Sequence, residues 1–210
     1  MALDLEEQEK LEELKAWWRQ HGTLVAAVIL AVAAGFASWQ GWRWYQANQA
    51  ANASALYDQL TKAVQANDPK ALRDAAGTLV ETYPRTAYAA MGALVTARYF
   101  FEREDLRSAK LQLQWVMERA RSEDFRDLAR LRLAALLLDE KAYDEALKLL
   151  QQPHGAAYEA PYAALRGDIL VAQDQTVEAR TAYTAALEKA ARQDPAFQES
   201  IRMRLEALGG

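Results

Sequence analysis

The sequence predicts an all-α protein with two parts, a single N-terminal transmembrane helix and a solenoid of stacked helical hairpins. Three observations lead to this prediction. An uncharged, apolar stretch near the N-terminus is flanked by tryptophans, and no later segment shows the alternation typical of strands. Pairs of helix-length segments also recur along the rest of the chain, which is typical of repeat architectures.

The predicted transmembrane helix lies in residues 20–42, which contain no Asp, Glu, Lys or Arg. As a helix with a rise of about 1.5 Å per residue, this stretch spans roughly 35 Å, and the hydrocarbon core of a bilayer is about 30 Å thick. Indole rings prefer the headgroup layer, so tryptophans at both ends favour a spanning helix over a buried core helix. We expect these membrane-interface anchors to be Trp17, Trp18, Trp39, Trp42 and Trp44.

The basic residues near this stretch predict its orientation. Lys10, Lys15 and Arg19 precede it, whereas only Arg43 follows it before Lys62. Lys and Arg are enriched in cytoplasmic flanks, so the N-terminus is expected in the cytoplasm and the C-terminal domain on the other side.

A cleaved signal peptide is the alternative interpretation, since small residues such as Ala31 and Ala33 suit a signal peptidase. Its charged region before the apolar stretch would be about 20 residues long and mostly acidic, which is atypical. The chain has no Cys to carry a lipid, so a bacterial lipoprotein is excluded.

A row of small side chains falls on one face of the predicted transmembrane helix. Such a row allows a second helix to approach closely in lipid, where apolar surface alone does not drive association. An Ala-rich anchor with accidental order would look the same, so both interpretations stay open. The candidate residues for an intramembrane helix contact are Ala27, Ala31, Ala34, Gly35 and Ser38.

After residue 45 the chain reads as a series of helices. Ala and Leu abound, and apolar residues recur every three or four positions. Proline-containing turns separate the segments. The predicted helices cover residues 50–66, 70–82, 86–102, 105–120, 124–139, 143–151, 159–173, 176–191 and 195–207, and the transmembrane helix is free to continue unbroken into the first of them.

These helices form pairs that repeat in register. Aligning the second helices at Ala109, Ala146 and Ala179 gives periods of 37 and 33 residues, and a small residue lies twelve positions before each. This is the spacing of tetratricopeptide repeats, where small residues let the two helices of a hairpin pack closely. Residues 50–82 are a weaker candidate for another pair, and the last helix is expected to cap the final repeat.

Stacked hairpins of this kind form a concave groove that holds peptides or helices. The repeat alignment places five residues of the first helices on that groove, although Phe101 and Leu138 are equally well explained as core residues. The candidate partner-binding residues are Arg98, Phe101, Ala135, Leu138 and Asp168.

No motif for catalysis, cofactor binding or metal binding is present. Neither His21 nor His154 has a metal-ligand partner three or four residues away, and there is no phosphate-binding glycine loop. The formal net charge is −4, without a basic stripe that would indicate a nucleic-acid partner. We therefore expect a protein that is not an enzyme, carries no cofactor and binds no nucleic acid.

Several short strings resemble the YfgM family, the ancillary subunits of the bacterial Sec translocon. They are Gly-Trp-Arg-Trp-Tyr at residues 41–45, the repeat at residues 141–150, and Leu-Arg-Gly-Asp at residues 165–168. The resemblance covers nearly the whole chain. It implies a single-pass type II protein of the bacterial inner membrane that associates with the SecYEG translocon and with a PpiD-like membrane-anchored periplasmic chaperone.

The resemblance thus implies an adaptor that assists the transfer of translocated proteins from the translocon to periplasmic chaperones. Residues 1–20 would form a cytoplasmic amphipathic segment, residues 21–45 the transmembrane anchor, and residues 46–210 a periplasmic repeat domain. Three alternatives remain at this point: a tetratricopeptide scaffold or assembly factor for another cell-envelope complex, a direct chaperone, and an enzyme with an unrecognised site. Repeat grooves are generic, so the fold does not choose among them.

Overall fold

The computed structural model describes residues 2–190 and 194–209, with side chains from residue 9 onward. The first residue of the predicted segment 1–20, the end of the predicted helix 176–191 and the last residue of the predicted domain 46–210 lie outside the described residues. The described part of the chain folds into nine α-helices and one short 3-10 helix, without a strand. The all-α prediction is therefore confirmed.

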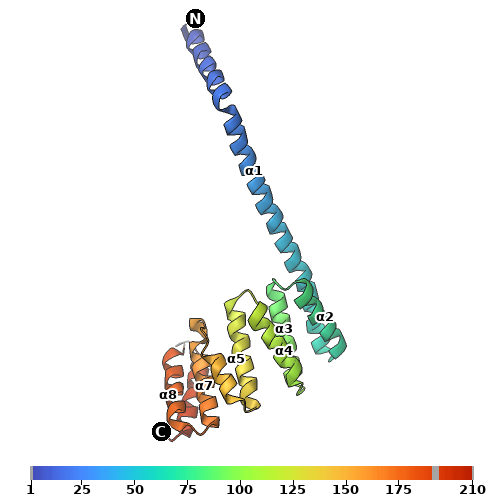
Figure 1. Cartoon of the computed structure of the whole chain (residues 1–210), viewed down its shortest axis with the longest axis vertical. Helices are drawn as coiled ribbons and strands as arrows, with labels where there is room; N and C mark the ends of the chain where they lie inside the picture. The colour runs from blue at the N-terminus through green and yellow to red at the C-terminus, as the bar shows by residue number, and fades with distance from the viewer. Residues whose placement is uncertain (1, 191–193, 210) are drawn as a thin grey trace. The chain divides into compact units, whose positions relative to one another are not determined.

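Helix α1 (Ala2–Gln65) is the longest element (Figure 1). The chain divides into two compact units, Met1–Gln49 and Ala50–Gly210, so α1 supplies all of the first unit and the first helix of the second. Among the described residues, α1 is the one helix long and apolar enough to cross a membrane, judged by its length and composition. As the sequence suggested, the apolar stretch continues into the following helix without a break.

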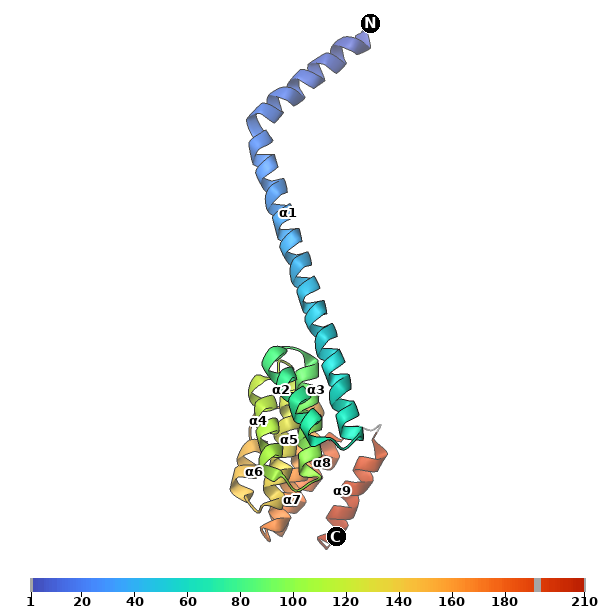
Figure 2. The same ribbon diagram turned by 90° about the vertical axis from the view of Figure 1, so that its right-hand side faces the viewer.

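Within the first unit, α1 bends in its N-terminal third, shown in blue in Figure 2. The indole of Trp18 packs over Gly22, which is buried although the residues after it are exposed. A Cβ atom at Gly22 would lie 3.2 Å from the indole Nε1. Glycine therefore lets an aromatic ring lie against the backbone at the N-terminal end of the uncharged stretch.

The second unit is a repeat domain of four consecutive helical hairpins, followed by a final helix (Figures 1 and 2). The end of α1 pairs with α2, and three further pairs follow along the chain. The elements are α2 (Pro69–Thr82), α3 (Ala87–Phe101), α4 (Leu106–Arg119), α5 (Glu123–Asp139), α6 (Tyr143–Leu150), η1 (Ala156–Tyr158), α7 (Glu159–Ala172), α8 (Thr176–Lys189) and α9 (Pro195–Ala207).

Side-chain caps fix where several of these helices begin. Asp68 accepts a 3.0 Å hydrogen bond from the backbone N–H of Lys70, and Pro69 occupies the first turn, where its missing N–H costs nothing. Asp105 caps α4 by accepting from the N–H of Ser108 at 3.0 Å. The hydrogen bonds from Ser108 hold the pKa of Asp105 below its usual value.

All four hairpins use the same turn. In each, one residue has left-handed backbone geometry, and the N–H of the next residue donates to a carbonyl five positions earlier, inside the first helix. This is the pattern of a Schellman motif, which satisfies carbonyls at a helix end. The left-handed residues are Asn67, Glu104, Lys141 and Asp174, with φ between 54° and 63°. Residues 50–82 therefore form a fourth pair built like the other three.

The small residues of the predicted register lie where the two helices of the second, third and fourth hairpins meet. Ala97 faces Ala109 in the second hairpin, Ala134 and Ala146 are fully buried in the third, and Gly167 and Ala179 are buried in the fourth. The predicted cap is also present, because α9 packs on α8. Its Ile201 is fully buried in a cluster with Ala164, Tyr183 and Ala186.

Gly167 offers a direct test of this close packing. A Cβ atom there would lie 2.9 Å from Cζ of Tyr183, and closer still to two other ring carbons. Tyr183 is buried and hydrogen-bonded, so the ring cannot move aside freely. We expect Gly167→Ala to destabilise the domain by about 1–3 kcal/mol, as overpacking does. Urea unfolding of the full chain in detergent measures this.

Gly77→Ala is the matched control, because Gly77 lies inside α2 and nothing approaches its Cβ position within 4 Å. Alanine should stabilise that helix by about 0.5–1 kcal/mol. Equal effects of the two substitutions would contradict the packing role of Gly167.

Candidate partner-binding site

A cavity of about 260 Å³ lies between three consecutive helices of the repeat domain, and we call it the α3–α5 cavity. Small residues of α3 and α4 leave the space, and longer side chains of α3 and α5 border it. The lining residues are Ala97, Arg98, Phe101, Ala109, Leu113, Arg132, Ala135, Leu136 and Asp139.

The interior of this cavity is apolar. Ala97, Ala109, Leu113 and Leu136 are all buried and belong to the main hydrophobic core. Phe101 lies at the C-terminal end of α3 with 44% of its surface exposed. An exposed aromatic ring beside a buried apolar surface is typical of sites that bind a partner side chain.

Two arginines give the cavity its electrostatic character. Arg98 forms an exposed ion pair with Glu102, with 2.7 Å between Nε and Oε1. Arg132 has no ion pair with any residue that the structure describes. Partial burial lowers the pKa of Arg132, and the positive charge of Arg98 lowers it further. The cavity is therefore bordered by an exposed cation that forms no ion pair within the described part of the chain.

The structure brings together three of the five predicted groove residues, since Arg98, Phe101 and Ala135 line this one cavity. Leu138 instead packs against the main core. Asp168 lies elsewhere, where it accepts a 2.7 Å hydrogen bond from the hydroxyl of Tyr183 and pairs with Arg204 of α9 at 2.9 Å.

Asp168 connects helices within the domain and does not line the α3–α5 cavity. Burial raises its pKa, while the hydrogen bond from Tyr183 and the charge of Arg204 oppose that shift. Burial, followed by the bond to Asp168, also raises the pKa of Tyr183. This cluster joins α7, α8 and α9.

The sequence did not indicate Leu113, Arg132, Leu136 and Asp139 as lining residues. Arg132 precedes Ala135 by three positions, and residues three apart share a helix face, so the repeat alignment could have indicated it. Leu113 lies on α4, the second helix of its hairpin, whereas the repeat alignment places only first-helix residues on the groove.

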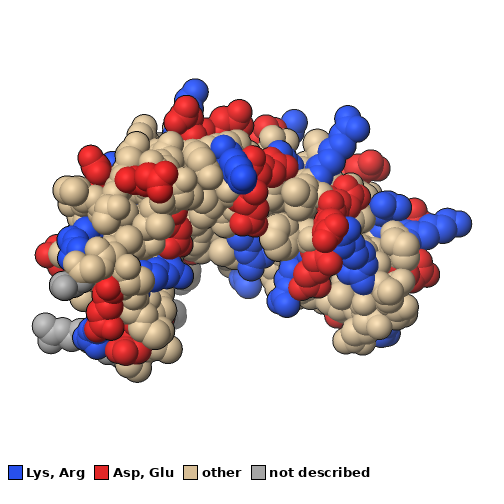
Figure 3. Space-filling view, turned by 90° about the horizontal axis from the view of Figure 1, so that it is seen from below, with Lys and Arg blue, Asp and Glu red and all other residues tan. Residues whose placement is uncertain are grey.

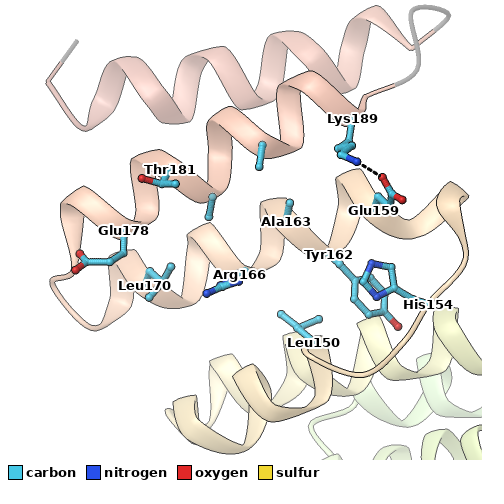
Figure 4. Close-up of a pocket in the computed structure, with 12 residues that line it drawn as sticks. Leu150, His154, Glu159, Tyr162, Ala163, Arg166, Leu170, Glu178, Thr181 and Lys189 are labelled. Carbon is cyan, nitrogen blue, oxygen red and sulfur yellow. Dashed lines mark ion pairs between the residues drawn. The ribbon is translucent and has the colours of Figure 1, made fainter.

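A second, larger cavity of about 520 Å³ lies along α7 and α8 (Figure 4). Its wall includes Leu150 at the end of α6, together with Ala163 and Leu170 of α7. Glu159 and Lys189 form an ion pair of 2.7 Å at one end. The cavity lies where α6, with 8 residues, ends early, whereas α4 and α8 each have 14.

A set of hydrogen bonds centred on the carboxylate of Asp127 holds the segment that follows the short helix α6, and we call this set the polar joint. Asp127 of α5 is 4% exposed, and its carboxylate accepts from Arg130 at 2.8 Å and from the N–H of Gly155 at 2.9 Å. Arg130 also donates to the carbonyl of Pro153 at 3.1 Å, and the hydroxyl of Tyr162 donates to the carbonyl of Asp127 at 2.9 Å. These bonds tie both the segment after α6 and α7 to the start of α5.

Other predicted sites lie on α1, apart from these cavities. All five small residues of the predicted intramembrane contact are exposed, as are the five tryptophans. The hydroxyl of Ser38 donates to the carbonyl of Ala34 at 2.8 Å, so its polarity is satisfied within the helix. A Cβ atom at Gly35 would contact nothing within 4 Å. The contact itself stays a prediction.

Charged side chains of both signs are mixed on the surface of the molecule shown in Figure 3, without an extended patch of one sign. Within the described residues, no group of three or more His, Asp or Glu side chains could hold a metal ion.

Comparison with known proteins gives consistent results over nearly the whole chain. The family described as "Tetratricopeptide repeat-like domain" matches residues 15–210. The chain is 32% identical to a protein of Haemophilus influenzae named ancillary SecYEG translocon subunit, over 99% of this chain and 100% of that protein. Proteins of the same name from Neisseria gonorrhoeae (30% identical; 99% of this chain, 100% of that protein) and Escherichia coli (27% identical; 96% of each) are also similar. No solved structure matches the chain.

The polar joint predicts a large effect of Asp127→Ala. Removing this buried carboxylate leaves the guanidinium of Arg130, whose side chain is 15% exposed, without its partner, and frees the N–H of Gly155. We expect a loss of about 3–5 kcal/mol of stability, as is usual when one partner of a buried ion pair is removed. Thermal and urea unfolding of the full chain measure the loss.

Glu123→Ala is the control, because Glu123 pairs with Arg126 at 3.1 Å on the same helix but is 84% exposed. An exposed pair of this kind contributes less than about 1 kcal/mol. Similar losses in the two variants would show that the joint is not a stabilising element.

Proposed function

Because the chain belongs to the tetratricopeptide repeat-like family of ancillary SecYEG translocon subunits, we propose that it is a membrane-anchored adaptor of the SecYEG translocon. In this role it links the channel to periplasmic chaperones and assists the transfer of translocated proteins. The observation that carries the proposal is similarity to translocon subunits over nearly the full length of both chains, which includes the anchor and the repeats.

The proposed topology is a single-pass type II protein of the bacterial inner membrane. Residues 1–20 are cytoplasmic, residues 21–45 form the anchor, and residues 46–210 form a periplasmic repeat domain. Lys10, Lys15 and Arg19 before the anchor, against Arg43 after it, support this orientation. The tryptophans at both ends of the anchor support its depth in the bilayer.

Each unit has a proposed task. The small-residue face of α1 packs against a helix of the translocon or of the chaperone's own anchor. The repeat domain docks a PpiD-like membrane-anchored chaperone at the α3–α5 cavity, which combines an exposed aromatic ring, an apolar interior and an unpaired cation. The adaptor acts by binding alone, as a non-enzymatic subunit.

Affinity capture from membranes in mild detergent tests the translocon association. A chain tagged at its C-terminus should recover SecYEG. Replacing the small face with leucine (Ala27, Ala31, Ala34, Gly35 and Ser38) should reduce that recovery severalfold if this face meets the channel, because bulky side chains keep helices apart.

The matched control replaces the opposite face with leucine (Val25, Ile29, Val32 and Phe36) and should leave recovery unchanged. Recovery of division or outer-membrane assembly proteins without SecYEG would refute the translocon role and favour a scaffold of another envelope complex.

Reporter fusions test the topology. A reporter active only in the periplasm should work when fused after Gly210, and one active only in the cytoplasm should not. An immunoblot should show the full mass of the chain, because the anchor is not removed. Cytoplasmic activity would reverse the orientation, and a shortened chain would indicate a cleaved signal peptide.

A further inference from the structure

We propose that the α3–α5 cavity recognises a peptide segment of a partner protein in which an acidic side chain stands next to a large apolar side chain. This inference rests on the proposed adaptor function, because it names the chemistry of the ligand that the repeat domain binds. Its two parts, an apolar contact and an anionic contact, follow from separate features of the cavity.

The apolar contact follows from the shape and lining of the cavity. A volume of about 260 Å³ is small beside the roughly 300–1,000 Å³ of typical ligand pockets, so it accepts one or two side chains and not a folded element. Ala97 and Ala109 create this space, and Leu113 and Leu136 form its walls. Phe101 is exposed at the edge, where a ligand side chain would cover it.

The anionic contact follows from the charges that face the cavity. Arg98 is already paired with Glu102, whereas Arg132 has no ion pair among the described residues. Partial burial, followed by the positive charge of Arg98, lowers the pKa of Arg132, so the like charges of the two arginines disfavour each other. A ligand carboxylate beside Arg132 would relieve this repulsion, and a guanidinium can bind a carboxylate through two parallel hydrogen bonds.

Asp139 is the one acidic residue that lines the cavity, and it determines where the carboxylate can lie. It follows Arg132 by seven positions on α5, which is about 10 Å along the helix axis. The ligand carboxylate therefore belongs at the Arg98 and Arg132 end, and its apolar neighbour lies over Phe101 and the interior. A basic ligand would meet Arg132 and is disfavoured.

Peptide binding to the full chain in detergent micelles tests the proposal. The probe is a fluorescently labelled twelve-residue peptide with a central Leu-Glu-Phe-Glu segment flanked by Gly and Ser. One comparison peptide carries Gln for Glu, and another carries Ser for Leu and Phe. Fluorescence anisotropy, corrected for empty micelles, should show the probe binding at least tenfold more tightly than either comparison peptide.

Variants of the chain separate the two contacts. Arg132→Gln should abolish the preference for the Glu peptide over the Gln peptide. Ala135→Trp places a large ring in the cavity from a half-buried position of its wall, so it should weaken the binding of the probe and of the Gln peptide to the same extent. Arg121→Gln is the control, because Arg121 is exposed between α4 and α5 and does not line the cavity. Circular dichroism checks that each variant is folded.

Equal binding of the Glu and Gln peptides, no binding of the probe, or an unchanged preference in folded Arg132→Gln would each overturn the proposal. Self-association that Arg132→Gln abolishes would do so too, by assigning the cavity to a second copy of the chain. If the unaltered chain captures SecYEG but fails to bind the probe, this inference fails while the proposed function stands. If the chain binds the probe but does not capture SecYEG, the proposed function fails while the assignment of the ligand to this cavity stands.

Discussion

Close approach of the two helices within the second, third and fourth hairpins is the constraint on which most of the repeat domain depends. The axes can come close only where both helices carry small side chains, as at Ala97 and Ala109 or at Ala134 and Ala146. Where the fourth hairpin has Gly167, the ring of Tyr183 fills the space that a methyl group would need. Ala97 and Ala109 also leave room for the α3–α5 cavity, so close packing and the proposed binding surface have one origin.

The turns add a second constraint that is independent of side-chain size. A left-handed residue ends each first helix, and none of the four is glycine, although glycine adopts this geometry at the lowest cost. The identical hydrogen-bond pattern of the four turns shows that the backbone, and not a particular side chain, sets the angle at which the chain reverses. The two helices of each hairpin thus meet in the same register.

Much of this architecture could be predicted from the sequence because it depends on local signals. Helical periodicity, proline-containing turns and the spacing of small residues located the helices after residue 45 to within a few positions. The hairpin of residues 50–82 was harder to recognise, because its sequence lacks the clear register of the others. Its turn at Asn67 nevertheless matches theirs.

The polar joint and the charge of the cavity could not be predicted in the same way. Asp127 and Gly155 are 28 positions apart, and the bond between them exists only once α5 and the segment after α6 are folded together. The unpaired state of Arg132 likewise depends on which side chains of neighbouring helices reach it. Such contacts follow from tertiary structure, and sequence spacing carries no signal for them.

The early end of α6 has a consequence for the cooperativity of unfolding. In a solenoid each repeat gains stability from its neighbours alone, so a weakened junction divides the array into sections that open separately. Beyond this junction the buried side chains of α8 and α9 gather with Ala164 and Leu170 of α7 into two small clusters. Tyr162 and Ile169 on the other face of α7 belong to the main core of the earlier hairpins. We therefore expect α8 and α9 to unfold locally and close again while the earlier hairpins keep their structure.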